Sequence, residues 1–240
     1  MEARKVNAGN GWEWIAGGFQ LFKKSPGIWI AIFLIYMALS VVLAFVPFAV
    51  ILSPVLMGGL MLACHEQDRG EELKIEHLFA GFQTNLGQLA IIGAILFAIG
   101  IAFTIAMYIV MIVMVVGASV AASGDPASMG AGFMLVIALI MLIFMALMIP
   151  VMMAYIYAPA LVILKNMSAF DALKASFKAC WRNILPWLVY GIIAFVLTII
   201  AYLPLFLGML VMGPVLIGSM YASYKDVFNI DNADQALPAS

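Results

Sequence analysis

Charged side chains are scarce in this chain and are absent from four long stretches. Only 10% of the 240 residues are charged, against about 25% in soluble domains, and 66% are hydrophobic. A soluble core of this chain length cannot bury so much apolar surface. Each uncharged stretch exceeds the roughly 20 apolar residues that cross a bilayer, so the composition predicts an integral membrane protein. The stretches are residues 28–64, 89–122, 131–164 and 184–224.

Other absences restrict the function. No ionisable residue lies inside a predicted span, where proton-coupled carriers and many ion pathways place one. No Walker, HExxH or GxSxG motif occurs, and we expect no enzyme. Cys64 and Cys180 lack CxxC spacing and predict no metal or redox centre, so no cofactor is expected. The net charge of −1 gives no basic surplus for nucleic acid.

The basic residues predict the orientation. All eleven Lys and Arg lie in the N-terminal segment, the 65–88 loop, the 165–183 loop and the C-terminal tail. With two spans between each pair of these segments, all four lie on one side, which the positive-inside rule makes cytoplasmic. We therefore predict six transmembrane helices in a bacterial inner membrane, with both termini inside. The two middle stretches have 34 residues each, about 51 Å as helix, so a break at Pro150 and an eight-span alternative remain open.

A motif that occurs three times opens three repeats. It reads WEWIAGGFQ at 12–20, IEHLFAGFQ at 75–83 and FDALKASFK at 170–178. Its apolar residues recur at helical spacing, which predicts an amphipathic helix with one apolar face. In the first and third copies, Asn10 and Ser168 stand at the expected N-cap positions, with an acidic residue three positions later. The predicted apolar faces are Trp12, Ile15, Phe19 and Phe22, and Phe170, Leu173, Phe177 and Cys180.

A second shared segment carries a proline in each returning span. It reads SPVLMG at 53–58, APALVI at 158–163 and GPVLIG at 213–218. Proline in a transmembrane helix frees a backbone carbonyl and kinks the helix, so Pro54, Pro159 and Pro214 are candidate kink or cavity residues.

Together these patterns predict an all-α integral membrane fold. Six transmembrane helices form three parallel hairpin repeats, each preceded by an amphipathic helix on the cytoplasmic side. A ring and a row of hairpins both fit the sequence. The predicted single membrane domain is 1–230, with repeat 1 at 9–64, repeat 2 at 72–164, repeat 3 at 168–225 and a disordered tail at 231–240.

The candidate contact residues lie near the cytoplasmic ends of the spans. Aromatic and basic side chains at this level fit the headgroup layer, either as simple anchors or as a surface for lipid sensing or partner docking. Membrane lipids are the expected partners, with a membrane protein or a second copy as further candidates. The candidate residues are Trp12, Phe19, Lys23, Lys24, Phe170, Phe177, Lys178, Trp181 and Arg182.

Methionine is unusually frequent, with 18 residues. Met141, Met145, Met148 and Met152 follow one helical face, and thioethers at this spacing can bind Cu(I). Methionine is also a flexible apolar filler. These four residues are weak metal-site candidates, and packing is the preferred interpretation.

The third repeat resembles known bacterial families. Residues Ser168–Trp187 contain an AL-x-x-S-[FW] helix, a basic patch and then an apolar span. YciC-type inner-membrane proteins and the membrane region of some glycerophosphodiester phosphodiesterases are similar in this pattern. The opening GW-x-W at 11–14 and LF-x-K-x-P at 21–26 resemble a proteobacterial family of unknown function. The resemblance implies a multi-span inner-membrane protein and supplies no catalytic residue.

The sequence therefore favours a non-enzymatic inner-membrane protein that works through lipid or protein contacts, as an envelope organiser or accessory subunit. The alternative is a channel or carrier for a neutral or apolar solute, with its path near the three prolines. A weaker alternative is Cu(I) handling by the methionine rows.

Overall fold

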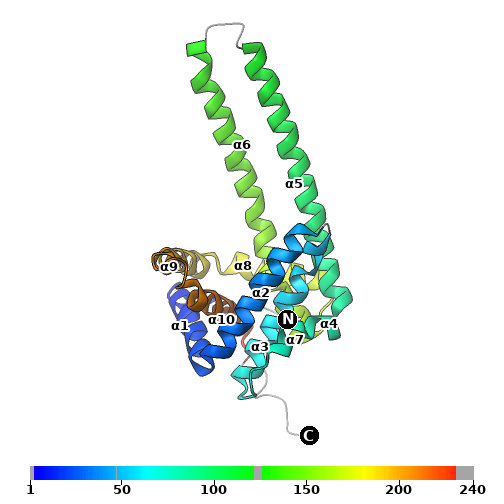
Figure 1. Cartoon of the computed structure of the whole chain (residues 1–240), viewed down its shortest axis with the longest axis vertical. Coiled ribbons are helices and arrows are strands. Elements are labelled where there is room, and N and C mark those ends of the chain that lie inside the picture. The colour runs from blue at the N-terminus through cyan, green and yellow to red at the C-terminus, as the bar shows by residue number, and fades with distance from the viewer. Residues whose placement is uncertain (1–2, 47, 122–125, 231–240) are drawn as a thin grey trace. The chain divides into compact units, whose positions relative to one another are not determined.

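The computed structural model describes residues 3–46, 48–121 and 126–230, and in this part of the chain it is helical without strands. This confirms the predicted all-α class. The predicted disordered tail at 231–240 lies outside the described residues. In chain order (Figure 1) the elements are α1 (Asn10–Lys24), α2 (Pro26–Phe45), η1 (Ala49–Leu52), α3 (Ser53–Asp68), η2 (Ile75–Phe79), α4 (Ala80–Gln83), α5 (Leu86–Ala121), α6 (Pro126–Tyr155), α7 (Ala158–Lys165), α8 (Ala169–Arg182), α9 (Ile184–Tyr202) and α10 (Met209–Phe228).

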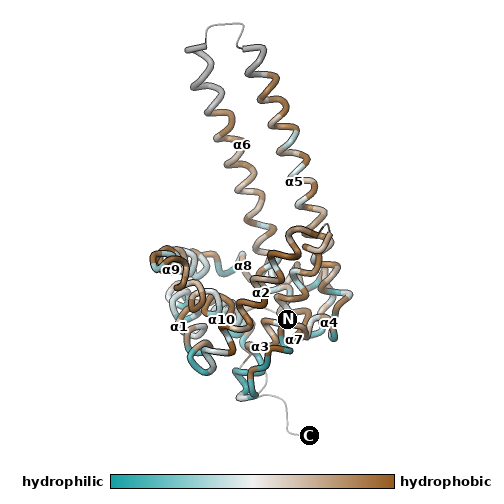
Figure 2. Tube along the Cα trace, viewed as in Figure 1, coloured by the Kyte–Doolittle hydropathy of each residue, from teal (hydrophilic) through white to brown (hydrophobic). Residues whose placement is uncertain are grey.

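Five helical segments of the described chain are long and apolar enough to cross a membrane. Long apolar helices satisfy their own backbone hydrogen bonds, which the hydrocarbon core requires. Figure 2 shows hydrophobic residues along most of α2 and α9. The five segments are Pro26–Phe45, Ala49–Asp68, Leu86–Val116, Leu135–Lys165 and Ile184–Tyr202.

The chain divides into two compact units. Residues 94–152 form one unit, made of most of α5 and α6, in which the rings of Phe103 and Phe144 meet at 4.7 Å between centroids. Residues 1–93 and 153–240 form the other unit, which contains the three amphipathic segments. The candidate contact surface therefore lies within one unit.

The long middle helices do not break where the sequence suggested. α5 has 36 residues and α6 has 30, about 54 and 45 Å of helix. Pro150 lies inside α6, so the predicted break at Pro150 is wrong. The helix ends at Tyr155 instead, and α7 begins at Ala158.

Two of the three repeat prolines begin helices. Pro54 follows the 3-10 turn η1 and lies in the first turn of α3, and Pro159 lies in the first turn of α7. Proline fits this position because the first N–H groups of a helix have no intrahelical acceptor. Pro214 lies inside α10. At Pro54 and Pro159 a helix start thus replaces the expected kink.

Each amphipathic segment packs on a helix that ends another repeat. α1 packs on α10 and α9, η2 and α4 pack on α3, and α8 packs on α7. These contacts build the core of the larger unit and determine which side of each segment faces outward.

Candidate membrane-interface site

Glycine lets α1 approach the backbone of α10 closely. A Cβ atom added at Gly18 would collide with the carbonyl oxygen of Val215 and the amide nitrogen of Ser219. Gly17, one residue earlier, faces the side chain of Ala222. Small residues at a helix crossing allow this approach, which makes Gly18 the point where α1 is held on α10.

The same motif position makes the same contact in the second repeat. Gly81 stands where Gly18 stands in the first copy of the motif. A Cβ atom at Gly81 would collide with the carbonyl oxygen of Val55, the residue after Pro54. Val215 likewise follows Pro214. Two copies of the repeat therefore share one type of crossing.

Serine occupies this position in the third repeat and interrupts a helix. The Ser176 hydroxyl donates to the carbonyl oxygen of Met153 at 2.7 Å and accepts from the amide of Tyr157 at 3.0 Å. In an unbroken helix Tyr157 would donate to Met153 directly. The buried hydroxyl of α8 bridges these two groups, and such insertion is a known cause of helix breaks. The bridge lies where α6 ends, and Pro159, four residues after Tyr155, has no N–H to continue the helix there.

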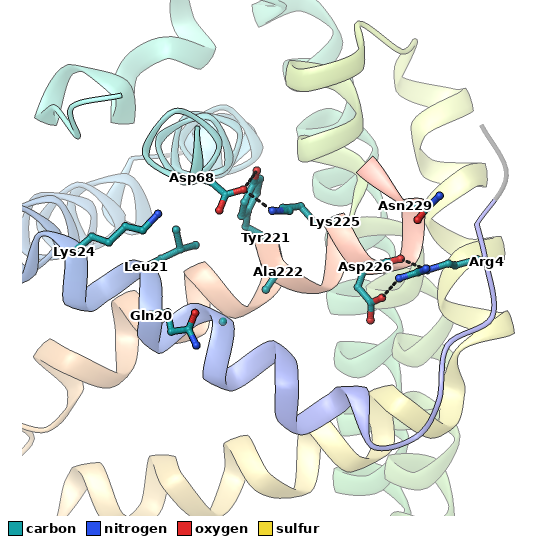
Figure 3. A pocket seen from close by; sticks show the side chains of 11 residues that line it. Arg4, Gln20, Leu21, Lys24, Asp68, Tyr221, Ala222, Lys225, Asp226 and Asn229 are labelled. Atoms are coloured by element: carbon teal, nitrogen blue, oxygen red, sulfur yellow. Dashed lines mark hydrogen bonds and ion pairs between the residues drawn. The ribbon is translucent and has the colours of Figure 1, made fainter. Parts of the chain in front are cut away.

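Asp226, near the end of α10, binds the N-terminal segment (Figure 3). One carboxylate oxygen forms an ion pair with Arg4. The other accepts from the Asn10 amide at 2.7 Å and from the indole N–H of Trp14 at 2.8 Å. Asn10 was predicted to cap α1, and it instead lies in the helix and donates to Asp226, which overturns that prediction. Ser168 does cap α8, because its hydroxyl accepts from the amide of Asp171 at 3.2 Å.

A polar cleft of about 410 Å³ joins the ends of α1, α3 and α10. In it Lys225 forms an ion pair with Asp68 at 2.5 Å, and the Tyr221 hydroxyl lies 3.4 Å from the same carboxylate (Figure 3). Lys24 lines the cleft and donates to the carbonyl oxygen of Gln67 at 3.4 Å. The cleft therefore ties together residues from the N-terminal helix, the end of α3 and the C-terminal helix.

Asn183 makes a second polar junction that the sequence analysis did not identify. Its buried side chain accepts from the amide of Val6 at 2.9 Å and donates to the carbonyl oxygens of Arg4 and Ala179. The neighbouring Arg182 donates to the carbonyl oxygen of Ala3 at 3.0 Å. Arg182, a predicted lipid-facing residue, thus also holds the N-terminal segment. Polar residues at the edge of an apolar span are the one sequence signal for this junction.

The predicted apolar face of α1 is divided in the structure. Ile15 and Phe22 are buried, whereas Trp12 is 54% exposed and Phe19 is 44% exposed. Trp14, outside the predicted face, is buried against α9 and α10, with its ring 5.3 Å from that of Trp187. The predicted apolar face is therefore partly buried and partly exposed. Close contact with two helices buries a wider side of α1 and leaves two aromatic rings outside.

The outer face of α8 carries its largest aromatic side chains. Phe170 is 61% exposed and Trp181 is 63% exposed, with the half-buried Phe177 stacked on Trp181 at 6.0 Å. Lys174 and Lys178 are exposed on the same helix. Small residues form the buried side of α8, because close packing on α7 favours small side chains. The buried residues are Ala169, Ala172, Ser176, Ala179 and Cys180.

The second amphipathic segment, formed by η2 and α4, also leaves aromatic rings outside. Phe79 and Phe82 are exposed and their rings lie 6.4 Å apart, whereas Leu78 and Gly81 are buried. All three segments therefore leave aromatic rings outside, although α1 also buries the rings of Trp14 and Phe22.

The remaining candidates do not join this surface. Pro54, Pro159 and Pro214 are buried and line neither the polar cleft nor the apolar groove described below. Met141, Met145 and Met152 are largely exposed on α6, and Met148 is half-buried. A groove of about 380 Å³ between α5 and α6 brings Met141 near the methionines of α5. In the described residues no group of three or more His, Cys, Asp or Glu forms a metal site.

Comparison with known proteins supports the location. A probable inner membrane protein of Burkholderia thailandensis is 26% identical to the chain, and the alignment covers 96% of this chain and 95% of the relative. No family model matches the chain, and no solved structure matches it at a significant level. With the apolar helices, this relative supports a multi-pass protein of a bacterial inner membrane.

Proposed function

We propose that this chain is a non-enzymatic inner-membrane protein that acts through lipid contacts at the cytoplasmic interface. The observation that carries the proposal is the outward placement of aromatic rings beside lysines on α1 and α8. Amphipathic rings and snorkelling lysines are favoured where hydrocarbon meets headgroups. The two helices therefore form a contact surface for an anionic membrane face, suited to an envelope organiser or accessory subunit.

A shared side for the basic segments supports the proposed orientation. Arg4 of the N-terminal segment meets Asp226, and Asp68 beside the 65–88 loop meets Lys225. Arg182 of the 165–183 loop meets the backbone of Ala3. Residues from all four basic segments thus lie together. This supports an even number of spans between them, with α10 as the sixth span and both termini inside.

The packing pattern supports a ring of repeats. α1 of the first repeat packs on α10 of the third, η2 and α4 of the second pack on α3 of the first, and α8 of the third packs on α7 of the second. Each repeat thus presents its amphipathic segment to the preceding repeat, in a closed order. In this proposal the ring holds the aromatic surfaces at one depth in the membrane.

Native mass spectrometry of the chain, extracted gently from its own membrane, tests this proposal. We expect a stoichiometric lipid adduct that decreases when Lys174 and Lys178 are both changed to Glu, because reversed charge repels anionic headgroups. A matched double change of Glu71 and Glu72 to Gln, in the exposed 65–88 loop, leaves the adduct unchanged. A chain without lipid adducts, or an adduct that is a protein subunit, contradicts the lipid proposal.

A further inference from the structure

An apolar groove of about 690 Å³ runs between α1 and the α9–α10 hairpin. Ile15, Ala16 and Phe19 of α1 form one wall, and residues such as Ile200 and Val211 form the other. The volume lies within the roughly 300–1,000 Å³ of small-molecule sites. Polar atoms contribute little to the lining, so the groove suits a hydrocarbon chain.

Lys23 is the one charged residue that lines this groove, and all the lining residues are described. Its ammonium lies 5.4 Å from the centre of the Phe19 ring. Among the described residues no carboxylate forms an ion pair with Lys23, whereas Arg4 and Lys225 each have one. The positive charge beside the groove is therefore uncompensated and available to an anionic group.

We propose that this groove binds one anionic phospholipid of the cytoplasmic leaflet, with its phosphate at Lys23 and an acyl chain between α1 and the α9–α10 hairpin. Charge complementarity favours this occupant, because an apolar channel beside a single free cation matches a negatively charged lipid. The exposed rings of Trp12 and Phe19 line the same groove, and such rings favour the headgroup level. The inference rests on the proposed function and assigns it a specific lipid site.

Lys24, next to Lys23 in the chain, faces a different space and does not contribute to the groove. Lys24, the next residue, lines the polar cleft and donates to the carbonyl oxygen of Gln67. Gln20 lines both spaces. α1 thus lies between a polar cleft that contains two ion pairs and an apolar groove beside Lys23, which has no ion pair among the described residues. The apolar groove is therefore the one that suits a lipid.

The test uses the full chain in nanodiscs of phosphatidylethanolamine and phosphatidylglycerol, released in the mass spectrometer. We expect the wild type to retain one phosphatidylglycerol. Lys23→Gln lowers this occupancy about fivefold, the effect expected for one lysine at an anionic membrane surface. Ala16→Phe lowers it similarly, because the ring fills the groove while the charge remains. The matched control Lys74→Gln, an exposed lysine that does not line the groove, leaves the occupancy unchanged.

Three results overturn the lipid site: equal retention of phosphatidylethanolamine, an equal loss in Lys23→Gln and Lys74→Gln, or full retention by Ala16→Phe. Thermal midpoints are recorded for each variant, and Lys23→Gln still decides the matter if Ala16→Phe folds poorly, since Lys23 is exposed. If the Lys174 and Lys178 double variant loses its native adduct while Lys23→Gln loses nothing, the groove site fails and the proposed function stands.

Discussion

α1 and α8 carry copies of one motif but use its seventh position in different ways. In α1 this residue is Gly18, and α10 passes the crossing as an unbroken helix. In α8 it is Ser176, whose hydroxyl takes the place of a backbone hydrogen bond, and the facing helix is broken. A small residue at a helix crossing can thus provide space alone, or space together with a donor and an acceptor.

The N-terminal ends of α1 and α8 also differ in the contacts that hold them. Ser168 caps α8 through its own neighbour Asp171, a local contact. Asn10 begins α1 but donates to Asp226, more than 200 residues away. α1 is therefore held by distant parts of the chain, and α8 supplies part of its own support.

The largest expected effect comes from closing the space at Gly18. Gly18→Leu places a side chain where even a Cβ atom collides with the α10 backbone. We expect a loss of about 3 kcal/mol in the free energy of unfolding, the upper end for overpacking, seen as a fall of about 6–12 °C in thermal midpoint in detergent. The measurement is intrinsic tryptophan fluorescence during heating, since Trp14 lies on α1.

Gly191→Leu on α9 is the matched control, because no atom lies within 4 Å of a Cβ at Gly191. Its midpoint stays close to that of the wild type. Equal midpoints for the Gly18 and Gly191 variants would show that α1 does not depend on its close approach to α10.

The sequence predicted the elements better than their buried faces. The repeated motif identified α1 and α8 and placed Phe170 and Phe177 on one apolar face, but it did not show which side of each helix packs on the protein. In soluble proteins an apolar stripe marks the side that packs. In a membrane protein apolar rings can also face lipid, and small residues such as Ser176 occupy the packed side. The pattern alone cannot separate these two cases.

The candidate site depended on contacts that no local pattern contains. Asp226 joins Arg4, Asn10 and Trp14 from the opposite end of the chain. Its place among few charged residues near an apolar span was the only hint in the sequence. The part of Ser176 in the helix break was missed for the same reason, since Pro150 and Pro159 are visible in the sequence whereas Ser176 acts from another helix.

Removing the hydroxyl of Ser176 has the next largest expected effect. Ser176→Ala leaves the carbonyl of Met153 and the amide of Tyr157 without their bridging partner. Unsatisfied buried groups cost about 1–3 kcal/mol, so we expect a clear fall in thermal midpoint. Ser40→Ala is the control, because that hydroxyl bonds only the carbonyl four residues earlier, at 2.7 Å. An unchanged midpoint for Ser176→Ala would mean that the facing helix closes its own hydrogen bond once the hydroxyl is gone.

The smallest expected effect on stability near neutral pH concerns Cys180, which occupies the position in α8 that Phe22 occupies in α1. Both side chains are buried, so the motif keeps this position inside in both helices. Burial raises the pKa of the Cys180 thiol from 9.0 to about 12, and a hydrogen bond to Ser176 opposes the shift. Because the thiolate is the reactive form, folded protein at pH 8 should be alkylated at Cys180 about a thousandfold more slowly than unfolded protein.

The pH dependence has a definite sign. The folded pKa of Cys180 lies above the unfolded one, so its contribution to stability is complete below pH 9 and decreases as the pH rises from about 9 to about 12. Iodoacetamide labelling followed by peptide mass mapping, in folded and in denatured protein, measures the difference in rate. Similar rates in the two states would place Cys180 on the outer side of α8 and would remove the position that α1 and α8 share.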